Sequence, residues 1–453
     1  MYVLMPLLFV LGILGVAFEE RLRVNKAATA LGLCILLWGV LLVDATGIFG
    51  NHPNPVIARL IQGFPAFAAL PFHDQVYQFT EFALTQHLGD VSGTLFFVLG
   101  SMAIINLVDT HGGFQALSGR LTARDQRKLL WTASGVAFFL SALLGNLATV
   151  IVMVAILRKL VPDRDTRLVH ACMLVIAANA GGAWSPIGDV TTLLLWTGEN
   201  LTAGHQVVHV LPSSLAMLLV PLALATFQLP QDAPVARTTP EADGRISRRA
   251  RDVVLLTALL SLALVPVLQS VLELPAFMGV LLGLVVLWVY TDRLYWHCPE
   301  EEMQALRVGG SFSRVDMTTV LFFLGILMAV GALQTAGQLG DLSKLLNAWF
   351  PRPETIAFVL GICSSFLDNV ALVAGTMGMY PVAHTGAFAA NGVFWTFLAY
   401  CAVTGGSLLI IGSASGVTVM GLEKIPFSYY LKRFSPLALL GYLAGAGVFF
   451  LVN

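Results

Sequence analysis

The sequence predicts an all-α polytopic membrane protein, built from two inverted-topology repeats of five transmembrane helices, each with a re-entrant hairpin and a broken helix. Its 453 residues are 57% hydrophobic and only 11% charged, whereas soluble domains carry about 25% charged residues. Apolar runs long enough to cross a bilayer recur along the chain, and similar motifs return in the same order in its second half. The formal net charge of −1 gives no basic field for nucleic acid, so we expect no such partner.

Ten apolar runs match the roughly 20 helical residues that cross a bilayer core of about 30 Å. The first run lacks a basic n-region and a cleavage site, so we expect a retained span rather than a signal peptide. The most polar stretch, 229–251, is predicted to be a cytoplasmic linker between a first repeat, 1–228, and a second repeat, 252–453. The predicted spans are 2–18, 27–43, 92–110, 168–200, 207–228, 252–270, 276–291, 318–336, 391–421 and 436–452.

Two further apolar runs, 129–157 and 355–380, fit no simple crossing. The first carries no charge along its whole length, and as one helix it would be about 43 Å long, too long for one span and too short for two. Polar residues lie at the middle of each run, Asn146 in the first and Asp368 with Asn369 in the second. Irregular backbone at membrane depth is tolerated only inside protein or beside a wet cavity, so we predict two re-entrant hairpins.

The basic residues favour these hairpins over the alternative, a bundle of simple crossings. With both hairpins re-entrant, 22 of the 25 Lys and Arg residues fall on one side, and only Arg59, Lys344 and Arg352 fall on the other. The positive-inside rule identifies the basic side as the cytoplasm. We therefore expect both termini to lie outside, on the side opposite the cytoplasm.

Residues 44–91 and 292–317 are predicted to be equivalent insertions in the two halves. Val76, Phe79 and Ala83 lie at helical spacing in the first insertion. This spacing favours an amphipathic helix at the membrane interface.

Three motifs of the first half recur in the second at nearly one offset. Each half would hold five crossings, an odd number, so the two halves lie inverted in the membrane. Inverted repeats with broken helices are a transporter architecture, with substrate bound where the repeats meet. The matching segments are 97–100 with 322–325, 141–148 with 364–371, and the glycines 181, 182 and 188 with 405, 406 and 412.

Two acids lie where a charge is costly. Asp189 lies in the predicted broken helix 168–200, close to Pro186, and Asp368 lies at the tip of the second hairpin. A carboxylate near the bilayer centre costs several kcal/mol, so such residues are functional more often than structural. A carboxyl group in a low-dielectric site can hold a proton and release it when a cation arrives.

Oxygen-bearing side chains surround these two acids, and no Cys/His cluster accompanies them. Such a set suits a hard cation such as Na⁺ or Li⁺, with Asp189, Asp368, Asn146 and Asn369 expected to bind sodium. A small hydroxyl residue taken singly serves helix packing equally often. We expect no cofactor and no catalytic residue. The predicted ion- and proton-binding residues are Asp189, Asp368, Asn146, Asn369, Asn179, Ser185, Thr191, Thr192, Ser364, Ser365 and Ser413.

At these residues the sequence resembles the NhaD-type Na⁺/H⁺ antiporters of the ion transporter superfamily. The resemblance rests on AGGAWSPIGDVTT at 180–192 and SSFLDNVA at 364–371, and it covers almost the whole chain. It implies exchange of Na⁺, often Li⁺, for protons across the bacterial cytoplasmic membrane, in which both termini would be periplasmic. It also implies a homodimer with a scaffold domain and an elevator-like transport domain. Superfamily members often carry Ser-Asn-Thr at the hairpin tips, whereas the tips here read Gly-Asn-Leu at 145–147 and Asp-Asn-Val at 368–370.

The sequence thus predicts a secondary active Na⁺(Li⁺)/H⁺ antiporter that exports sodium by alternating access, and not an enzyme. The nearest alternative is a Na⁺-coupled carboxylate or anion transporter of the same superfamily, although no Lys or Arg is expected at the midplane to bind an anion. A passive channel is a further alternative. A remote one is an intramembrane aspartyl protease, whose Gly-x-Gly-Asp pattern is interrupted here by Pro186.

Overall fold

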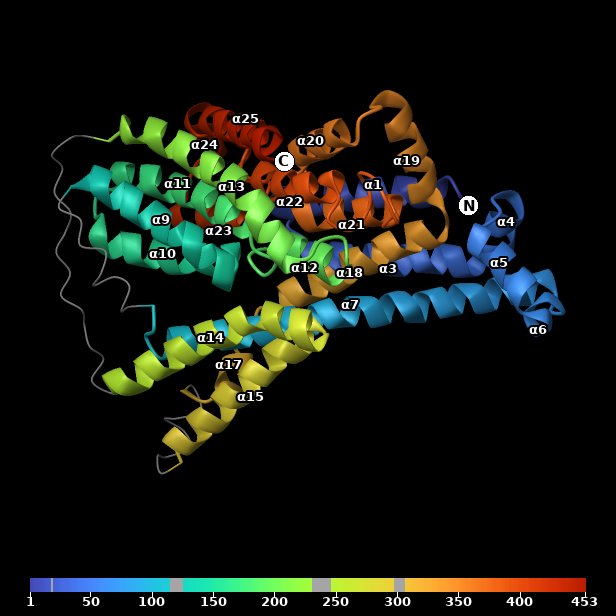
Figure 1. Ribbon diagram of the computed structural model, residues 1–453, viewed down its shortest axis with the longest axis horizontal. Helices are drawn as coiled ribbons and strands as arrows, with labels where there is room; N and C mark the ends of the chain where they lie inside the picture. Colours follow the sequence, from blue (N-terminus) through green and yellow to red (C-terminus); the bar gives the residue numbers. More distant parts are fainter. Residues whose placement is uncertain (18, 115–124, 230–245, 297–305) are drawn as a thin grey trace. The chain divides into compact units, whose positions relative to one another are not determined.

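The computed structural model describes residues 1–17, 19–114, 125–229, 246–296 and 306–453, which form helices and no named strand. Most of the predicted linker 229–251 lies outside the described residues. So do Arg120 and Arg124, two of the basic residues that the predicted topology places in the cytoplasm. The described residues divide into two compact units, and each unit takes segments from both predicted repeats (Figure 1). Unit 1 comprises Met1–Leu95, Asp316–Ile356 and Val370–Pro381, and unit 2 comprises Phe96–Val315, Ala357–Asn369 and Val382–Asn453.

Unit 1 is organised around α3, which packs against α1 and α18. A Cβ atom on Gly325 of α18 would lie 2.5 Å from the backbone of Ala30 on α3, so the absence of a side chain allows this close approach. Its helices are α1 (Leu4–Ala17), α2 (Glu19–Leu22), α3 (Lys26–Val43), α4 (Ala45–Asn51), α5 (Pro55–Gly63), α6 (Pro65–Ala68), α18 (Met317–Thr335), α19 (Gln338–Trp349), the first part of α7 (Phe72–Thr110) and most of α21 (Asn369–Met379).

Unit 2 is organised around α11, which packs against α9, α10, α13, α22 and α23. Every residue of α11 from 168 to 183 is buried, and so is every residue of α22 from 394 to 405. Its helices are α9 (Gln126–Leu144), α10 (Asn146–Leu160), α11 (Arg164–Ala183), α12 (Val190–Thr197), α13 (Ala203–Thr226), α14 (Arg248–Leu272), α15 (Ala276–Leu294), α17 (Val308–Phe312), α22 (Val393–Gly405), α23 (Ala414–Glu423), α24 (Phe427–Arg433), α25 (Ser435–Val452) and most of α20 (Pro353–Cys363).

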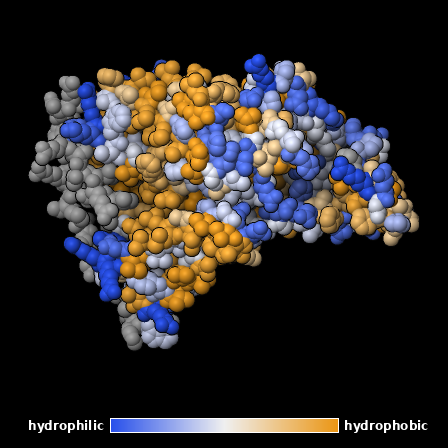
Figure 2. Space-filling model, viewed as in Figure 1, coloured by the Kyte–Doolittle hydropathy of each residue, from blue (hydrophilic) through white to orange (hydrophobic). Residues whose placement is uncertain are grey.

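The prediction of an all-α polytopic membrane protein is confirmed. Eight helices among the described residues are long and apolar enough to cross a membrane. Seven of them coincide with predicted spans, and the eighth, α9, is the first arm of the predicted hairpin. Figure 2 shows hydrophobic residues over α14, α15 and α25 of unit 2, as expected for surfaces that face lipid. Exposed apolar side chains there include Leu256, Leu260, Leu264, Leu282, Val285, Val286, Val289, Leu439, Leu443 and Phe450.

Two segments between the predicted spans differ from what the sequence led us to expect. Residues 76–83 do form a helix, but it is the first part of α7, which continues without a break into the span 92–110. No proline interrupts 72–110, so the polar residues change the surface of the helix without ending it. Helix α19 (Gln338–Trp349) was not predicted.

A helix break occurs in each of the two predicted hairpins and in each of the two predicted broken helices. The break between α9 and α10 lies at Gly145, whose φ of 84° favours glycine over any residue with a side chain. The other three breaks are 184–189 between α11 and α12, 364–368 between α20 and α21, and 406–413 between α22 and α23.

Contacts at the two ends of unit 2 establish the direction of its helices. At one end, Arg158 at the end of α10 and Arg167 at the start of α11 both bind Glu423 at the end of α23. At the other end, the backbone N–H of Asn391 before α22 donates to the carbonyl of Asn200 after α12, at 2.9 Å. The two broken helices therefore run antiparallel through unit 2.

The pair α9 and α10 enters and leaves at one end of unit 2. His170 near the start of α11 contacts the carbonyl of Gln126 at the start of α9, at 3.2 Å. In the middle of the unit, the N–H of Asn146 donates to the carbonyl of Gly188 at 3.1 Å. The pair thus reaches the first helix break and returns to the end from which it came.

Similar serine contacts occur at two pairs of matching sequence motifs. Ser141 Oγ donates to the carbonyl of Ala178 at 2.6 Å, and Ser364 Oγ donates to that of Ala402 at 2.7 Å. The second pair repeats the first at nearly the offset that relates the sequence motifs. Each contact joins a hairpin arm to the middle of a broken helix.

Close glycine contacts recur in the same way. A Cβ on Gly181 would lie 2.1 Å from the carbonyl oxygen of Phe138, and one on Gly405 would lie 1.9 Å from that of Gly361. These two pairs are again related by nearly the same offset in the sequence. In both halves a hairpin arm therefore crosses a broken helix where only glycine fits.

Candidate functional site

Asp189 lies at the first helix break, where it caps α12. Its carboxylate accepts the N–H of Thr191 at 2.7 Å, and Thr192 Oγ1 accepts the N–H of Asp189 at 3.3 Å. Together these bonds form a capping box, which satisfies backbone donors that a helix start otherwise leaves free. Asp189 is only 6% exposed, so the sequence Gly-Asp-Val-Thr-Thr at 188–192 folds into a buried helix start with a carboxylate at its tip.

Both hairpin tips bring an asparagine to this carboxylate. Asn146, the first residue of α10, donates from Nδ2 to Asp189 Oδ2 and also to Asn179 Oδ1, at 3.2 Å for the latter. Asn369, the first residue of α21, has its Nδ2 3.4 Å from both carboxylate oxygens of Asp189. Asp368 precedes Asn369 in the second tip, and the two acids interact electrostatically.

Asn179 on α11 connects this group to the second helix break. Its Nδ2 donates to Ser407 Oγ at 2.9 Å and Ser413 Oγ at 3.0 Å. Its Oδ1 accepts from Ser415 Oγ at 2.7 Å. A single hydrogen-bond network, entirely within unit 2, therefore joins both hairpin tips and both broken helices.

N-terminal ends of some helices and C-terminal ends of others lie at this network. Helices α10, α12, α21 and α23 begin there, and α9, α11, α20 and α22 end there. Helix starts favour a negative charge. Helix ends present free carbonyl oxygens, which favour a cation.

One buried hydroxyl group, that of Thr149, lacks a hydrogen-bond partner within the described part of the chain. Thr149 lies one turn after Asn146 on α10 and is fully buried. The hydroxyl group of Thr191, also fully buried, interacts with the carboxylate of Asp189. Buried polar atoms are nearly always hydrogen-bonded, so the free hydroxyl group of Thr149 is a candidate for contact with a bound ligand.

The predicted site residues divide into two groups. Eight lie in the network or directly beside it: Asp189, Asp368, Asn146, Asn369, Asn179, Thr191, Thr192 and Ser413.

The other three predicted residues direct their hydroxyl groups to backbone carbonyls rather than to the network. Ser185 donates to Ala142 at 2.6 Å, Ser364 to Ala402 as described above, and Ser365 to Ile362 at 2.7 Å. These serines hold the helix breaks together.

Ser407 and Ser415, two of the oxygen-bearing residues that the sequence offers near the second helix break, bind Asn179 and so belong to the network. Thr149, which the sequence did not single out, offers a buried hydroxyl group without a partner among the described residues. The spacing of three residues from Asn146 to Thr149 places both on one helix face, and this was the available signal for Thr149.

The site is rich in neutral oxygen atoms. No group of three or more His, Cys, Asp or Glu residues that could hold a metal ion occurs within the described ranges. Amide and hydroxyl groups with few charges suit a weakly bound hard monovalent cation better than a tightly held transition metal.

Comparison with known proteins identifies the family. A sequence model described as "Citrate transporter" matches residues 7–400. Sodium/proton antiporter 1 of Arabidopsis thaliana is 39% identical over all of this chain and 72% of its own length. Sodium/proton antiporter 2 of the same plant is 35% identical, over 99% of both chains. The NhaD Na⁺/H⁺ antiporter of Alkalimonas amylolytica is 29% identical over 98% of this chain and 89% of its own.

The chain belongs to the NhaD-type antiporter family. The resemblance read from residues 180–192 and 364–371 is thereby confirmed. Membership of this family identifies a multi-pass membrane transporter rather than a protease.

Proposed function

We propose that the protein is a secondary active antiporter that exports Na⁺, or Li⁺, in exchange for protons. The observation that carries this proposal is the environment of Asp189. Its carboxylate is buried, and its hydrogen-bond partners are the amides of Asn146 and Asn369 and a backbone N–H. All of these partners are neutral, so the charge can be balanced by a bound cation or by a proton.

The amides of Asn146 and Asn369 would change role when the cation binds. Each now directs Nδ2 at Asp189. The terminal torsion of asparagine is soft, so rotation of the amide about it presents Oδ1 instead. We propose that Na⁺ then binds Asp189, Asp368 and these two amide oxygens. The hydroxyl groups of Thr149 and Thr191 would complete the shell.

Exchange follows from competition at one carboxylate. The same Asp189 oxygen cannot hold a proton and a cation together, so each ligand displaces the other. Loss of the proton leaves a negative charge on the carboxylate and would prepare the site for Na⁺. Alternating access then converts competition into exchange.

The proposal includes two inverted repeats, 1–228 and 252–453, with hairpins 129–157 and 355–380. The serine and glycine contacts, which recur in both halves at nearly one sequence offset, support it. So does the return of α9 and α10 to one end of unit 2. The homodimer and the elevator-like movement that the family resemblance implies belong to the same proposal.

For the membrane we propose the bacterial cytoplasmic membrane, with both termini periplasmic. Arg158, Arg164, Arg167 and Lys424 gather at one end of unit 2, which supports that end as cytoplasmic. Single cysteines at Lys128 and Asp163, in a chain otherwise free of cysteine, test the first hairpin. Labelling of both from the cytoplasm is expected, and labelling from opposite sides would exclude the hairpin.

Proton flux in everted vesicles tests the exchange itself. Addition of NaCl or LiCl should collapse a preformed ΔpH in vesicles that contain the protein, whereas KCl or sodium-free succinate should not. The variants Asp189→Asn and Asp368→Asn should each lose the response. The matched control, Asp74→Asn, changes an acid whose side chain is 51% exposed, and it should keep the response. Full exchange by both site variants would contradict the proposal.

A second candidate is Na⁺-coupled transport of a carboxylate. The description of the matching family and the four helix starts at the network favour it. Uptake of succinate or citrate that depends on NaCl, without proton release, would establish this function instead of exchange.

A further inference from the structure

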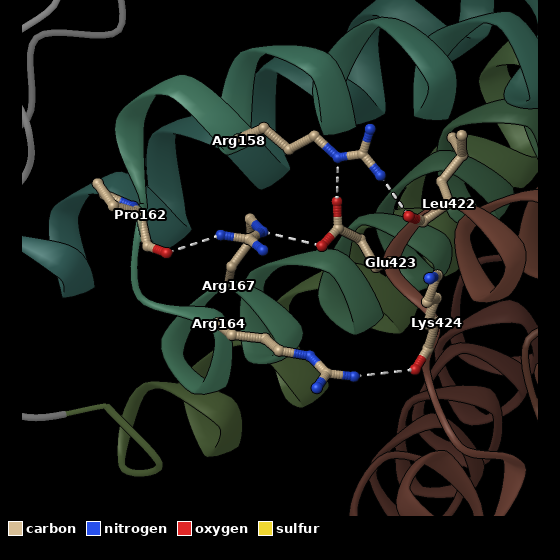
Figure 3. Close-up of a pocket in the computed structure, with 7 residues that line it drawn as sticks. All are labelled: Arg158, Pro162, Arg164, Arg167, Leu422, Glu423 and Lys424. Atoms are coloured by element: carbon tan, nitrogen blue, oxygen red, sulfur yellow. Dashed lines mark hydrogen bonds and ion pairs between the residues drawn. The ribbon is translucent and has the colours of Figure 1, made fainter.

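A second polar site lies at the basic end of unit 2, away from Asp189. A cavity of about 410 Å³ lies between the turn that joins α10 to α11 and the end of α23. Figure 3 shows the residues that line it. Its charged lining residues are Arg158, Arg164, Arg167, Glu423 and Lys424. On α11, Asn179 of the hydrogen-bond network follows Arg167 by twelve positions, which corresponds to about 18 Å along the helix.

Glu423 holds two of these arginines in place. Its side chain is 2% exposed, with Oε1 bound to Arg158 Nε at 2.6 Å and Oε2 to Arg167 Nε at 2.8 Å. Arg158 also donates to the carbonyl of Leu422, and Arg167 to that of Val161 at 2.8 Å. Both carboxylate oxygens are therefore occupied, and both guanidinium groups are fixed.

The other two cations have no acidic partner within the described ranges. Arg164 has one weak contact, to the carbonyl of Lys424 at 3.5 Å, and both side chains are exposed. Four cations and one buried carboxylate give the cavity a net charge of +3. The equivalent end of α12 carries Glu199, which is exposed, so the two ends of unit 2 differ.

We propose that this cavity binds a phosphate group. Guanidinium groups donate paired N–H bonds that match phosphate oxygens, and Lys424 adds a mobile point charge. The charge of Glu423 is offset by the two guanidinium groups that bind it, so the cavity keeps its net positive charge. The phosphate comes from an anionic phospholipid headgroup or from a soluble phosphate compound, and the site does not depend on cation chemistry at Asp189.

The test uses the full-length protein in nanodiscs and measures its thermal unfolding midpoint. One arm adds inorganic pyrophosphate to discs of phosphatidylcholine, and the other uses phosphatidylcholine mixed with phosphatidylglycerol. We expect the wild type to be stabilised in at least one arm. Stabilisation only by phosphatidylglycerol identifies a headgroup site, and stabilisation by pyrophosphate identifies a soluble ligand.

The deciding variant combines Arg164→Gln with Lys424→Gln, which removes two exposed cations and no ion pair with an acid. It should lose the stabilisation, with affinity for the phosphate group about tenfold lower or more. The matched control combines Arg59→Gln with Arg352→Gln, two exposed cations of unit 1, and it should behave as wild type.

Lys424→Gln alone provides a second variant and should weaken binding severalfold. The proposal is overturned if neither arm stabilises the wild type. It is equally overturned if the double variant keeps the wild-type shift.

Discussion

The two helix breaks of unit 2 have the same geometry but different chemistry. Asp189 caps α12 and Ser413 caps α23, at positions that correspond in the proposed repeats. At the hairpin tips the acid lies in the other half. The second tip carries Asp368 where the first tip carries Gly145. Each half thus contributes one acid, and it does so at non-equivalent positions.

This difference separates architecture from ion chemistry. The serine bonds to Ala178 and Ala402 and the close glycine contacts occur in both halves, so they build the breaks. The carboxylates occur once each, so they are not needed to build a break. Serine caps a helix about as well as aspartate, and Ser413 shows that a break folds with a neutral cap.

The largest expected effect comes from Asp189→Ser, which makes the first break resemble the second. The hydroxyl group keeps a cap on α12, so the unfolding midpoint should stay close to that of wild type. Na⁺-driven proton flux should fall about tenfold or more, because the buried charge is lost. Flux in proteoliposomes and thermal unfolding measure the two effects. Equal loss of stability and flux would mean that Asp189 acts as a cap only.

The next effect concerns the shared architecture. Gly181→Ala and Gly405→Ala place a methyl group 2.1 Å and 1.9 Å from a backbone oxygen, so each should lower stability by about 3 kcal/mol. Gly135→Ala in α9 is the matched control, since nothing lies within 4 Å of its Cβ. Denaturation in mild detergent measures the change. A large effect in one half only would contradict equivalent roles for the two crossings.

Glu423→Gln tests an asymmetry between the ends of unit 2. Burial raises the pKa of this carboxyl, but the hydrogen bonds and charges of Arg167 and Arg158 outweigh burial and leave the pKa below its ordinary value of 4.5. Its stabilisation is therefore present above pH 4.5 and is lost as the pH falls through the lowered pKa. Glu423→Gln should cost about 2 kcal/mol at neutral pH and flatten the acid limb of the stability curve.

Glu199→Gln is the control for that prediction, because Glu199 occupies the position of the first half that corresponds to Glu423 and is exposed. We expect a change within about 0.5 kcal/mol. Unfolding midpoints between pH 3 and 8 compare the two variants. Similar pH profiles for both would contradict a special role for the buried carboxylate.

Ser413→Ala should have the smallest effect among the site variants. It removes the bond to the N–H of Gly416 and one partner of Asn179, at a cost of about 1 kcal/mol. Because no charge is lost, exchange should continue at a reduced rate. Complete loss of flux at normal stability would mean that Ser413, like Asp189, is essential for exchange, and would contradict this prediction.

Much of the fold could be predicted from sequence because its signals are strong. Lipid requires long apolar helices, and glycine, proline and buried polar residues mark the places where these helices break. Helix α7 was misjudged because a change from polar to apolar surface does not end a helix when no proline is present. Helix α19 was missed because the apolar runs on each side dominate the local pattern.

The site was only partly predictable, for a different reason. Asp189, Asn146 and Asn369 were identified because buried polar residues are costly and therefore few. Hydroxyl residues carry no such signal, since the same side chain can bind a ligand, as proposed for Thr149, or a nearby carbonyl, as Ser185 does. Only the three-dimensional arrangement of carbonyl groups separates these cases.

Proton release from the purified protein tests the central claim most directly, namely that Na⁺ and H⁺ compete for Asp189. NaCl is added to the protein in weakly buffered detergent solution, and choline chloride serves as the salt control. We predict that NaCl acidifies the solution with the wild type, that choline chloride does not, and that Asp189→Asn abolishes the response. Equal proton release by Asp189→Asn and the wild type would contradict the account.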